Sequence, residues 1–203
     1  MADTENYTCY SCGAGVAVDA KICSYCNNPV RITTFNNVWD LPDPTVKKYI
    51  KSYEKDIGGE SDGGAQTAIA FCFLKLKLYD KAIEAFEGAL ENSFDNSEVF
   101  FYFAVCQLKG KKAFMASRGH IDKAIEYLSA AIQIEDRSVY HYLLAYIKYD
   151  FFKRKGYNIS PNFSEELETA QSIGLSDGDV EHLYSVLSVV MINSAFPAPI
   201  IES

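Results

Sequence analysis

Hydrophobic and polar residues alternate with a helical period through most of the chain after residue 64. Two segments show the pattern most clearly, "DKAIEAFEGALE" (80–91) and "DKAIEYLSAAIQ" (122–133). In each segment, the first apolar residue is followed by others one, four, seven and eight positions later. This spacing places all five on one face of an α-helix. The first five residues are identical, and the apolar positions match at an offset of 42. We therefore predict a repeated helical unit rather than two unrelated amphipathic helices.

The matched positions resemble those of the tetratricopeptide repeat, a helix–turn–helix unit of 34 residues. In that family, small residues in both helices let the pair approach closely. The residues that match these small positions are Ala70, Ala82, Ala89, Ala104, Ala124 and Ala131. Phe86 and Leu128 match the large apolar site, and Tyr79 matches the turn between the helices. The second copy departs from the pattern by about eight extra residues around 112–120, and Phe94 replaces the usual closing proline.

A third, more divergent unit follows the two clear copies. Residues 138–152 have the character of a first helix, and "SEELETAQSIG" that of a second helix capped by Ser164 and ended by Gly174. Ser176 and Asp179 form a capping-box-like pair at the start of a last helix. The resemblance covers residues 64–175 and implies a mainly α fold, an antiparallel array of about seven to eight helices with an extended concave surface.

The first 35 residues have a different pattern, without helical periodicity and with short β-type runs such as "RITTF". The segment "NNVWDLPDP" then reads as a linker, and Asp43 and Pro44 predict an N-cap and first turn for a helix over 44–57. We therefore predict three parts: a small β module over 1–35, a linker over 36–43 and a helical domain over 44–203.

Four cysteines give the first module its chemistry. Cys9, Cys12, Cys23 and Cys26 form two Cys-x-x-Cys pairs, and two such turns can complete a tetrahedral thiolate shell around one structural Zn²⁺. Gly13 and Asn27 follow the two pairs and tolerate the positive φ that such turns often need. Iron is an alternative occupant. The cysteines could alternatively form a thioredoxin-type redox pair, although two adjacent Cys-x-x-Cys pairs without a βαβ pattern argue against that function.

The segment "ICSYCNNPVRI" resembles the second cysteine turn of a zinc ribbon. Many zinc ribbons bind nucleic acid, which would require a basic surface. Residues 1–35 carry Lys21 and Arg31 against Asp3, Glu5 and Asp19. The cysteines are therefore expected to fold the module rather than to read nucleic acid or to catalyse a reaction, since four protein thiolates leave no open position on the metal.

The overall charge of −8 argues against loose binding to nucleic acid or to an anionic membrane. The opening "MADTENYT" lacks the features of a secretory signal, and the longest apolar stretch, 186–196, is about half of what a bilayer requires. We therefore expect reduced cysteines, no membrane insertion and a cytoplasmic location.

No residue pattern predicts catalysis. Cys72 and Cys106 lie within apolar helical segments and are expected in the core. His120 is expected in a loop, and His141 and His182 on separate helices without metal-ligand spacing. We expect a protein that is not an enzyme, with an unrecognised catalytic site as an alternative.

The expected function is that of an adaptor that binds another protein. Family geometry implies an apolar groove lined by the first helices, covered by a partner, by the 44–57 helix or by the tail 196–203. The expected groove residues are Phe71, Leu74, Phe101, Val105, Leu108, Tyr140, Leu143 and Ile147. If this face is instead the core of a compact bundle, the ribbon tip at 16–21 is the next candidate surface. Nucleic-acid binding through the ribbon, with the helices used for assembly, is the remaining alternative.

Overall fold

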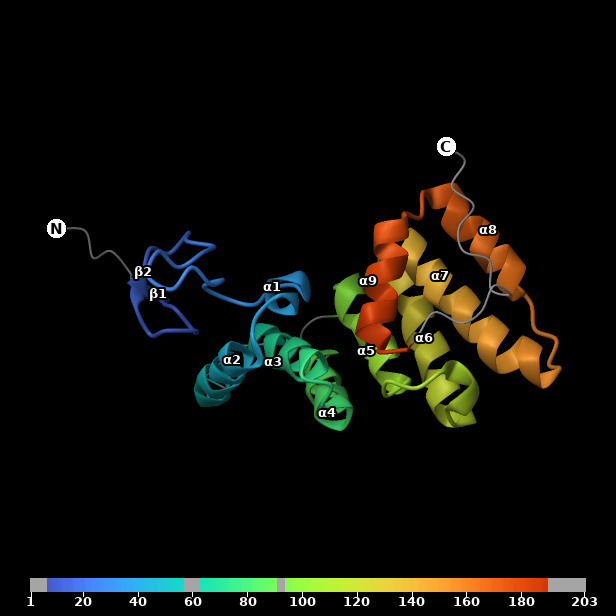
Figure 1. Ribbon diagram of the computed structural model, residues 1–203, viewed down its shortest axis with the longest axis horizontal. Helices are drawn as coiled ribbons and strands as arrows, with labels where there is room; N and C mark the ends of the chain where they lie inside the picture. The colour runs from blue at the N-terminus through green and yellow to red at the C-terminus, as the bar shows by residue number, and fades with distance from the viewer. Residues whose placement is uncertain (1–6, 57–62, 91–93, 190–203) are drawn as a thin grey trace. The chain divides into compact units, whose positions relative to one another are not determined.

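The computed structural model describes residues 7–56, 63–90 and 94–189. In these residues the protein is mainly helical, with nine α-helices and one two-stranded antiparallel sheet (Figure 1). The contacts between residues divide the chain into two compact units, 1–94 and 95–203. This division does not follow the predicted parts 1–35, 36–43 and 44–203, because the first helices belong with the cysteine module.

The cysteine module, residues 7–35, is called the ribbon below. Strands β1 (Tyr7–Thr8) and β2 (Gly15–Val16) pair with Tyr7 opposite Val16. A single bridge joins Ile22 and Pro29. The predicted β-type run at 31–35 forms no strand. Its amide at Ile32 instead donates to the Tyr53 hydroxyl at 2.8 Å, a side-chain partner in place of a neighbouring strand.

A short helix, α1 (Asn36–Trp39), lies within the predicted linker. Apolar contacts hold it, since Phe35 and Val38 are fully buried and the Phe35 ring lies 6.0 Å from that of Phe71. Helix α2 (Asp43–Asp56) then begins one residue before the predicted start. The Pro42 carbonyl accepts from the Val46 amide at 3.1 Å, so Asp43 lies inside the first turn and is not the N-cap.

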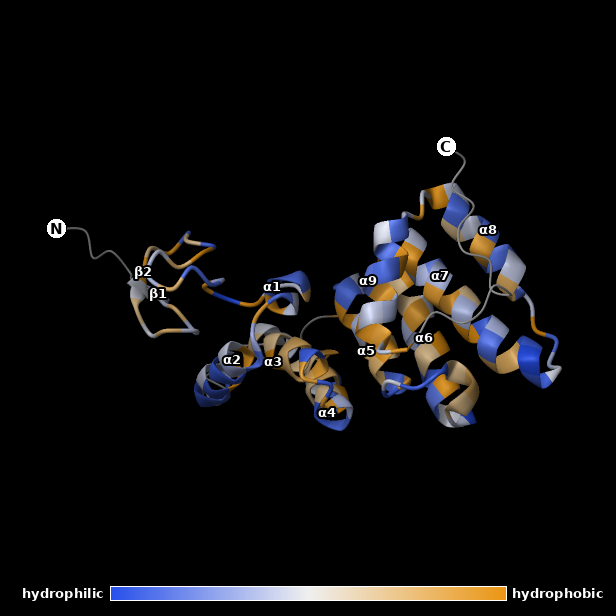
Figure 2. Ribbon diagram, viewed as in Figure 1, coloured by the Kyte–Doolittle hydropathy of each residue, from blue (hydrophilic) through white to orange (hydrophobic). Residues whose placement is uncertain are grey.

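Helices α3 (Gly63–Lys75) and α4 (Tyr79–Leu90) complete the first unit. Helix α3 packs against both α2 and α4, and in Figure 2 it is mostly hydrophobic whereas α2 carries many hydrophilic residues. Gly88 allows the close approach of α3 to α4, because a Cβ there would lie 2.2 Å from the Gln66 Oε1 atom. The Phe71 and Phe86 rings meet edge to face at 5.8 Å in the same interface.

Within residues 95–189, the described part of the second unit, five α-helices follow one another: α5 (Ser97–Gln107), α6 (Arg118–Ile134), α7 (Ser138–Ile147), α8 (Phe163–Ile173) and α9 (Asp177–Leu187). Helix α5 packs on α6, α6 on α7, and α7 on both α8 and α9. A π-helical segment, Lys148–Phe152, and a 3₁₀ turn, Lys153–Lys155, extend α7. Helices α5 and α7 are buried around most of their circumference, as expected for helices that are apolar on all sides.

Several predicted helix ends are confirmed. The Ser176 and Asp179 side chains form the predicted capping box of α9. Gly174 ends α8 in the left-handed conformation at φ +106°. The cap of α8 was predicted wrongly, because Asn162 and not Ser164 accepts the first amides of that helix.

The insertion between α5 and α6 is also more ordered than predicted. It forms a 3₁₀ turn, Ala113–Met115, and the first turn of α6, which begins with Ser117 as its N-cap. The prediction that His120 lies in a loop is therefore wrong. Its Nδ1 atom lies 2.9 Å from the Gln107 Oε1 atom of α5, which explains why the helix extends this far. Among the described helices, none is both long and apolar enough to cross a bilayer.

The packing of α6 leads to a first prediction. Ala124 is fully buried on this helix, so Ala124→Leu should overpack the interface and lower the free energy of unfolding by about 1–3 kcal/mol. Ala130→Leu, at a half-buried position of the same helix, should change it by less than about 0.5 kcal/mol. Urea denaturation followed by circular dichroism compares the two. Equal stabilities would mean that Ala124 does not face a packed helix.

Candidate metal centre

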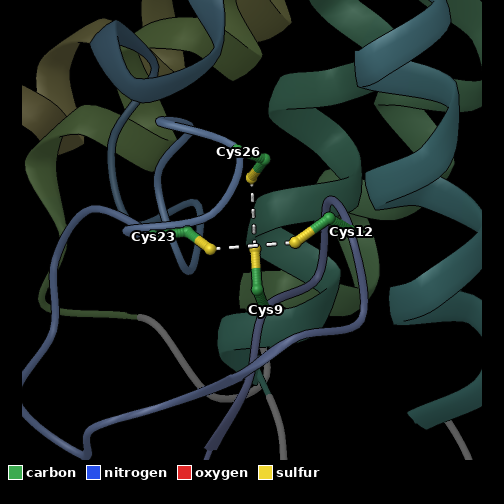
Figure 3. A group of neighbouring side chains, drawn as sticks. All are labelled: Cys9, Cys12, Cys23 and Cys26. Atoms are coloured by element: carbon green, nitrogen blue, oxygen red, sulfur yellow. Dashed lines mark hydrogen bonds between the residues drawn. The ribbon is translucent and has the colours of Figure 1, made fainter.

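The sulfur atoms of Cys9, Cys12, Cys23 and Cys26 converge on one point, as predicted (Figure 3). All four lie within 4.8 Å of one another. The Cys9 and Cys26 sulfurs are 3.8 Å apart, and those of Cys12 and Cys23 are 3.7 Å apart. A tetrahedral shell with Zn–S bonds of about 2.3 Å requires sulfur separations of about 3.8 Å. The cluster could therefore hold one metal ion without rearrangement.

Two backbone turns of the same kind position these sulfurs. The Cys9 carbonyl accepts from the Gly13 amide at 2.8 Å, and the Cys23 carbonyl accepts from the Asn27 amide at 2.9 Å. Gly13 has φ +78° and Asn27 has φ +58°, which confirms the prediction for both positions. No atom lies within 4 Å of a Cβ built at Gly13, so the backbone conformation and not a lack of space favours glycine there.

The two turns are joined to each other and to a very small core. The Asn28 amide side chain donates to the Ser11 hydroxyl at 2.9 Å and links the second turn to the first. The ribbon residues Ile32 and Phe35 are buried outside the sulfur site. The apolar cluster at the sulfur site has four buried residues, Cys9, Val16, Cys23 and Val30. Two of these four are candidate metal ligands. So small a cluster cannot hold the two cysteine turns together by apolar burial alone.

The protein environment acts in opposite directions on the pKa values of Cys9 and Cys23. Burial raises the pKa of Cys9 to about 12. Burial also acts on Cys23, but the amides of Cys26 and Tyr25 outweigh it and lower the pKa of this thiol to about 7. Without metal the cluster thus retains protons at neutral pH, and a metal ion must displace them. Metal affinity should consequently rise with pH and fall in acid.

The chemistry of the donor set is that of a structural site. Thiolate ligands suit zinc or iron, and four of them leave no position for water or substrate. Cys9 and Cys23 are buried, whereas Cys12 is exposed. Among the described residues, this is the one group of three or more potential ligand side chains close enough to share an ion.

The ribbon packs on helix α2, a contact that the sequence analysis missed. The Tyr10 and Tyr53 rings stack with centroids 4.2 Å apart. The Ser52 hydroxyl donates to the Tyr10 carbonyl at 2.8 Å, and the Tyr49 hydroxyl donates to the Pro29 carbonyl. These bonds explain why the ribbon and the first helices form one unit. The tyrosines of α2, four residues apart, gave no signal of this contact, because any amphipathic helix shows the same spacing.

The eight residues predicted to line a partner groove are all buried: Phe71, Leu74, Phe101, Val105, Leu108, Tyr140, Leu143 and Ile147. Phe101, for example, stacks on Tyr140 with ring centroids 4.7 Å apart. These side chains form interior packing within their units, so the predicted face is not an open groove. This arrangement matches the compact-bundle alternative. At the ribbon tip, Val16 is also buried, whereas Val18 is exposed.

Among the described residues, the remaining thiols and histidines form no second group of three or more potential metal ligands. Cys72 and Cys106 are fully buried, as predicted, and burial raises the pKa of Cys72 to about 12. His141 lies on α7 and His182 on α9.

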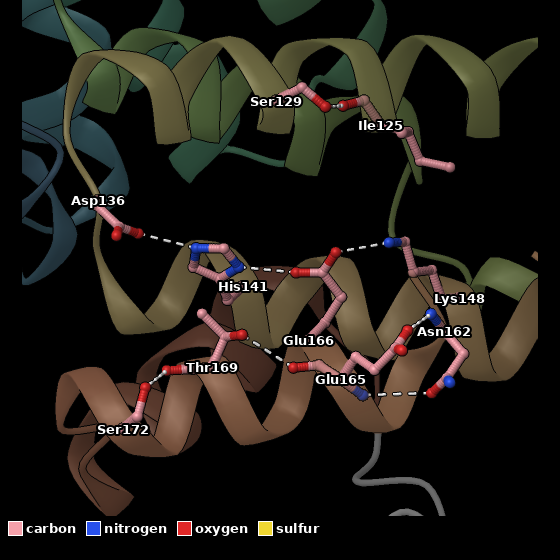
Figure 4. A network of polar contacts seen from close by, with 10 residues as sticks. All are labelled: Ile125, Ser129, Asp136, His141, Lys148, Asn162, Glu165, Glu166, Thr169 and Ser172. Carbon is pink, nitrogen blue, oxygen red and sulfur yellow. Dashed lines mark hydrogen bonds and ion pairs between the residues drawn. The ribbon is translucent and has the colours of Figure 1, made fainter. Parts of the chain in front are cut away.

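His141 takes part in a polar network between α7 and α8 that the sequence analysis missed (Figure 4). Its ring nitrogens lie 2.7 Å from Glu166 and 2.8 Å from Asp136. Lys148 donates to the other Glu166 oxygen at 2.6 Å, so Glu166 of α8 contacts two residues that come from α7 and its extension. The role of this network is therefore to hold α8 on α7.

The metal centre yields a second prediction. Freshly purified protein should carry one zinc ion per chain, measured by elemental analysis after dialysis. Cys23→Ser should lose most of it, because three thiolates bind far more weakly than four. Cys72→Ala is the matched control, since it removes a buried thiol outside the cluster and should retain the metal. Equal metal contents in the two variants would show that the cluster is not the site.

Comparisons with known proteins identify no family for this chain. No protein-family model matches it. A search of curated proteins likewise finds no match. The description of the metal centre and of the paired helices therefore rests on the residues and geometry of this chain.

Proposed function

We propose that this protein is a non-enzymatic adaptor, in which one structural zinc ion folds the ribbon and tetratricopeptide-like helical pairs support surfaces that bind other proteins. Three consecutive pairs, α3 with α4, α5 with α6 and α7 with α8, give the proposal its framework. Folds built from such pairs present extended surfaces and rarely carry catalytic residues.

The observation that carries the repeat assignment is the equal burial of matched positions. Ala82 and Ala124, Ala89 and Ala131, and Phe86 and Leu128 all have no exposed surface. The small residues of the first helices, Ala70 and Ala104, are equally buried. Side chains that match in sequence thus pack in matching ways in two separate compact units, which supports a repeated unit over a chance likeness.

The chemistry of the described residues supports a binding role. A closed thiolate shell can fold a module but cannot activate water or a substrate. The buried charged side chains Glu166 and Lys148 of the second unit pair with each other, and Glu166 also contacts His141. None of the six cysteines, all of which lie in the described residues, forms a disulfide, which fits the reducing cytoplasm that we propose as the location.

Nucleic-acid association through the ribbon is the second candidate. The observation in its favour is the local charge, since residues 7–56 hold six Lys and Arg residues against five Asp and Glu residues in a chain of net charge −8. Such a small local excess gives few phosphate contacts, so we favour a protein partner.

A copurification experiment separates the two candidates. Affinity-tagged full-length protein is isolated from its own cells with and without nuclease, and mass spectrometry quantifies the proteins that accompany it. We expect at least one partner whose recovery is unchanged by nuclease. A partner that disappears with nuclease would favour nucleic-acid association. Tagged protein that enriches nothing beyond a tag-only control would contradict the adaptor function.

A further inference from the structure

The first unit has a polar hollow where the ribbon meets α2. It has a volume of about 540 Å³, within the range of ligand-binding pockets. Tyr7, Thr8 and Arg31 line it from the ribbon, and Ser52 and Lys55 line it from α2. The hollow thus exists only while the ribbon is folded and packed on this helix.

The charge of the hollow contrasts with that of the whole protein. Its lining contains Arg31 and Lys55 and no carboxylate, although the chain carries a net charge of −8. Helix α2 continues the positive surface, because Lys47 and Lys51 precede Lys55 at intervals of four residues and all three are exposed. Side chains spaced by four lie on one face of a helix. Lys47, Lys51 and Lys55 thus form a row of exposed cations along α2 that ends at the hollow.

The aromatic residues of the ribbon fix the position of Arg31. Its guanidinium carbon lies 4.3 Å from the centroid of the Tyr7 ring and 5.8 Å from that of Tyr10. Tyr10 is itself held by its stacking on Tyr53. Within the part of the chain that the structure describes, Arg31 forms no ion pair. A guanidinium group whose flat face contacts an aromatic ring can still donate the N–H groups at its edge to a planar acceptor such as a carboxylate.

We propose that this hollow binds the carboxylates of an acidic peptide segment from a partner protein. The inference rests on the proposed adaptor function and names the partner's chemistry. Arg31 donates to one carboxylate with two N–H groups, the geometry in which arginine binds this group most strongly. Lys55 receives a second carboxylate, and Lys51 and Lys47 attract the acidic residues that follow along α2.

Two observations favour an acidic peptide over a nucleic acid. A single-stranded nucleic acid gains much of its affinity from bases stacked on free aromatic faces. In this hollow, Tyr53 covers one face of Tyr10, and Arg31 lies over the Tyr7 ring. The net charge of −8 also opposes a long phosphate backbone more than a short peptide that presents a few carboxylates.

Fluorescence anisotropy with zinc-loaded full-length protein tests the site. The probe is a fluorescein-labelled peptide of alternating glutamate and glycine, and a peptide with glutamine in place of glutamate is the reference. We expect saturable binding of the glutamate peptide alone, at a Kd below about 1 mM. Arg31→Gln should weaken it about tenfold, since it removes charge-assisted hydrogen bonds. Lys123→Gln, which removes one exposed positive charge from α6, is the matched control and should leave the affinity unchanged.

Each other result overturns a defined part of the proposal. If Arg31→Gln and Lys123→Gln retain the metal and lose equal affinity for the glutamate peptide, the general surface charge attracts the peptide and the hollow is not a specific site. Tighter binding of an oligothymidine of equal length would assign the hollow to nucleic acid. A copurified partner that Arg31→Gln still retains would overturn this site and leave the adaptor function standing. Saturable probe binding without any copurified partner would overturn the adaptor function instead.

Discussion

The convergence of four cysteine sulfurs is the constraint on which the first unit depends. The apolar cluster around the cysteine turns buries Cys9, Val16, Cys23 and Val30, so the turns require a link that this burial does not supply. A metal ion bound by the sulfurs would supply that link, and sulfur separations of 3.7 and 3.8 Å fit a single tetrahedral ion. The consequence extends beyond the ribbon, because the same residues that shape the cysteine turns also meet α2. Tyr10, which follows Cys9, stacks on Tyr53 and lines the cationic hollow.

The helices obey a different constraint, the need to bring backbones close together. Small residues at matched positions in α4 and α6, such as Ala82 and Ala124, have no exposed surface. Gly88 serves the same purpose where Gln66 of α3 approaches α4. Aromatic rings fill other parts of these interfaces, for example where Phe71 meets Phe86 between α3 and α4. The high aromatic content of the chain is therefore used inside the units, which moves the expected partner surface from the first helices to the exposed polar face of the first unit.

Features that depend on local spacing could be predicted from the sequence. The cysteine pairs, the positive φ at Gly13 and Asn27 and the buried alanines of the repeats all follow from residues close together or at a regular offset. Features that depend on contacts between distant segments could not be predicted from the sequence. Tyr49 and Tyr53 have the apolar spacing of any amphipathic helix, and that spacing does not indicate that they contact the ribbon. Glu166 lies 25 residues from His141, so the pattern around His141 does not reveal the network. A helix that is apolar on all sides can line a groove or lie in a core. Only the packing of neighbouring helices decides between these two arrangements.

The central claim is that a metal-bound ribbon and helix α2 form one structural unit, independent of the helices after residue 95. Hydrogen–deuterium exchange of the full-length protein, read by mass spectrometry before and after removal of the metal with a chelator, tests it most directly. The claim predicts faster exchange in residues 7–35 and in α2, because hydrogen bonds join the ribbon to this helix. Peptides of α5 to α9, which belong to the other compact unit, should be unchanged. Unchanged protection of α2 in the metal-free protein would contradict it, and so would loss of protection in every helix.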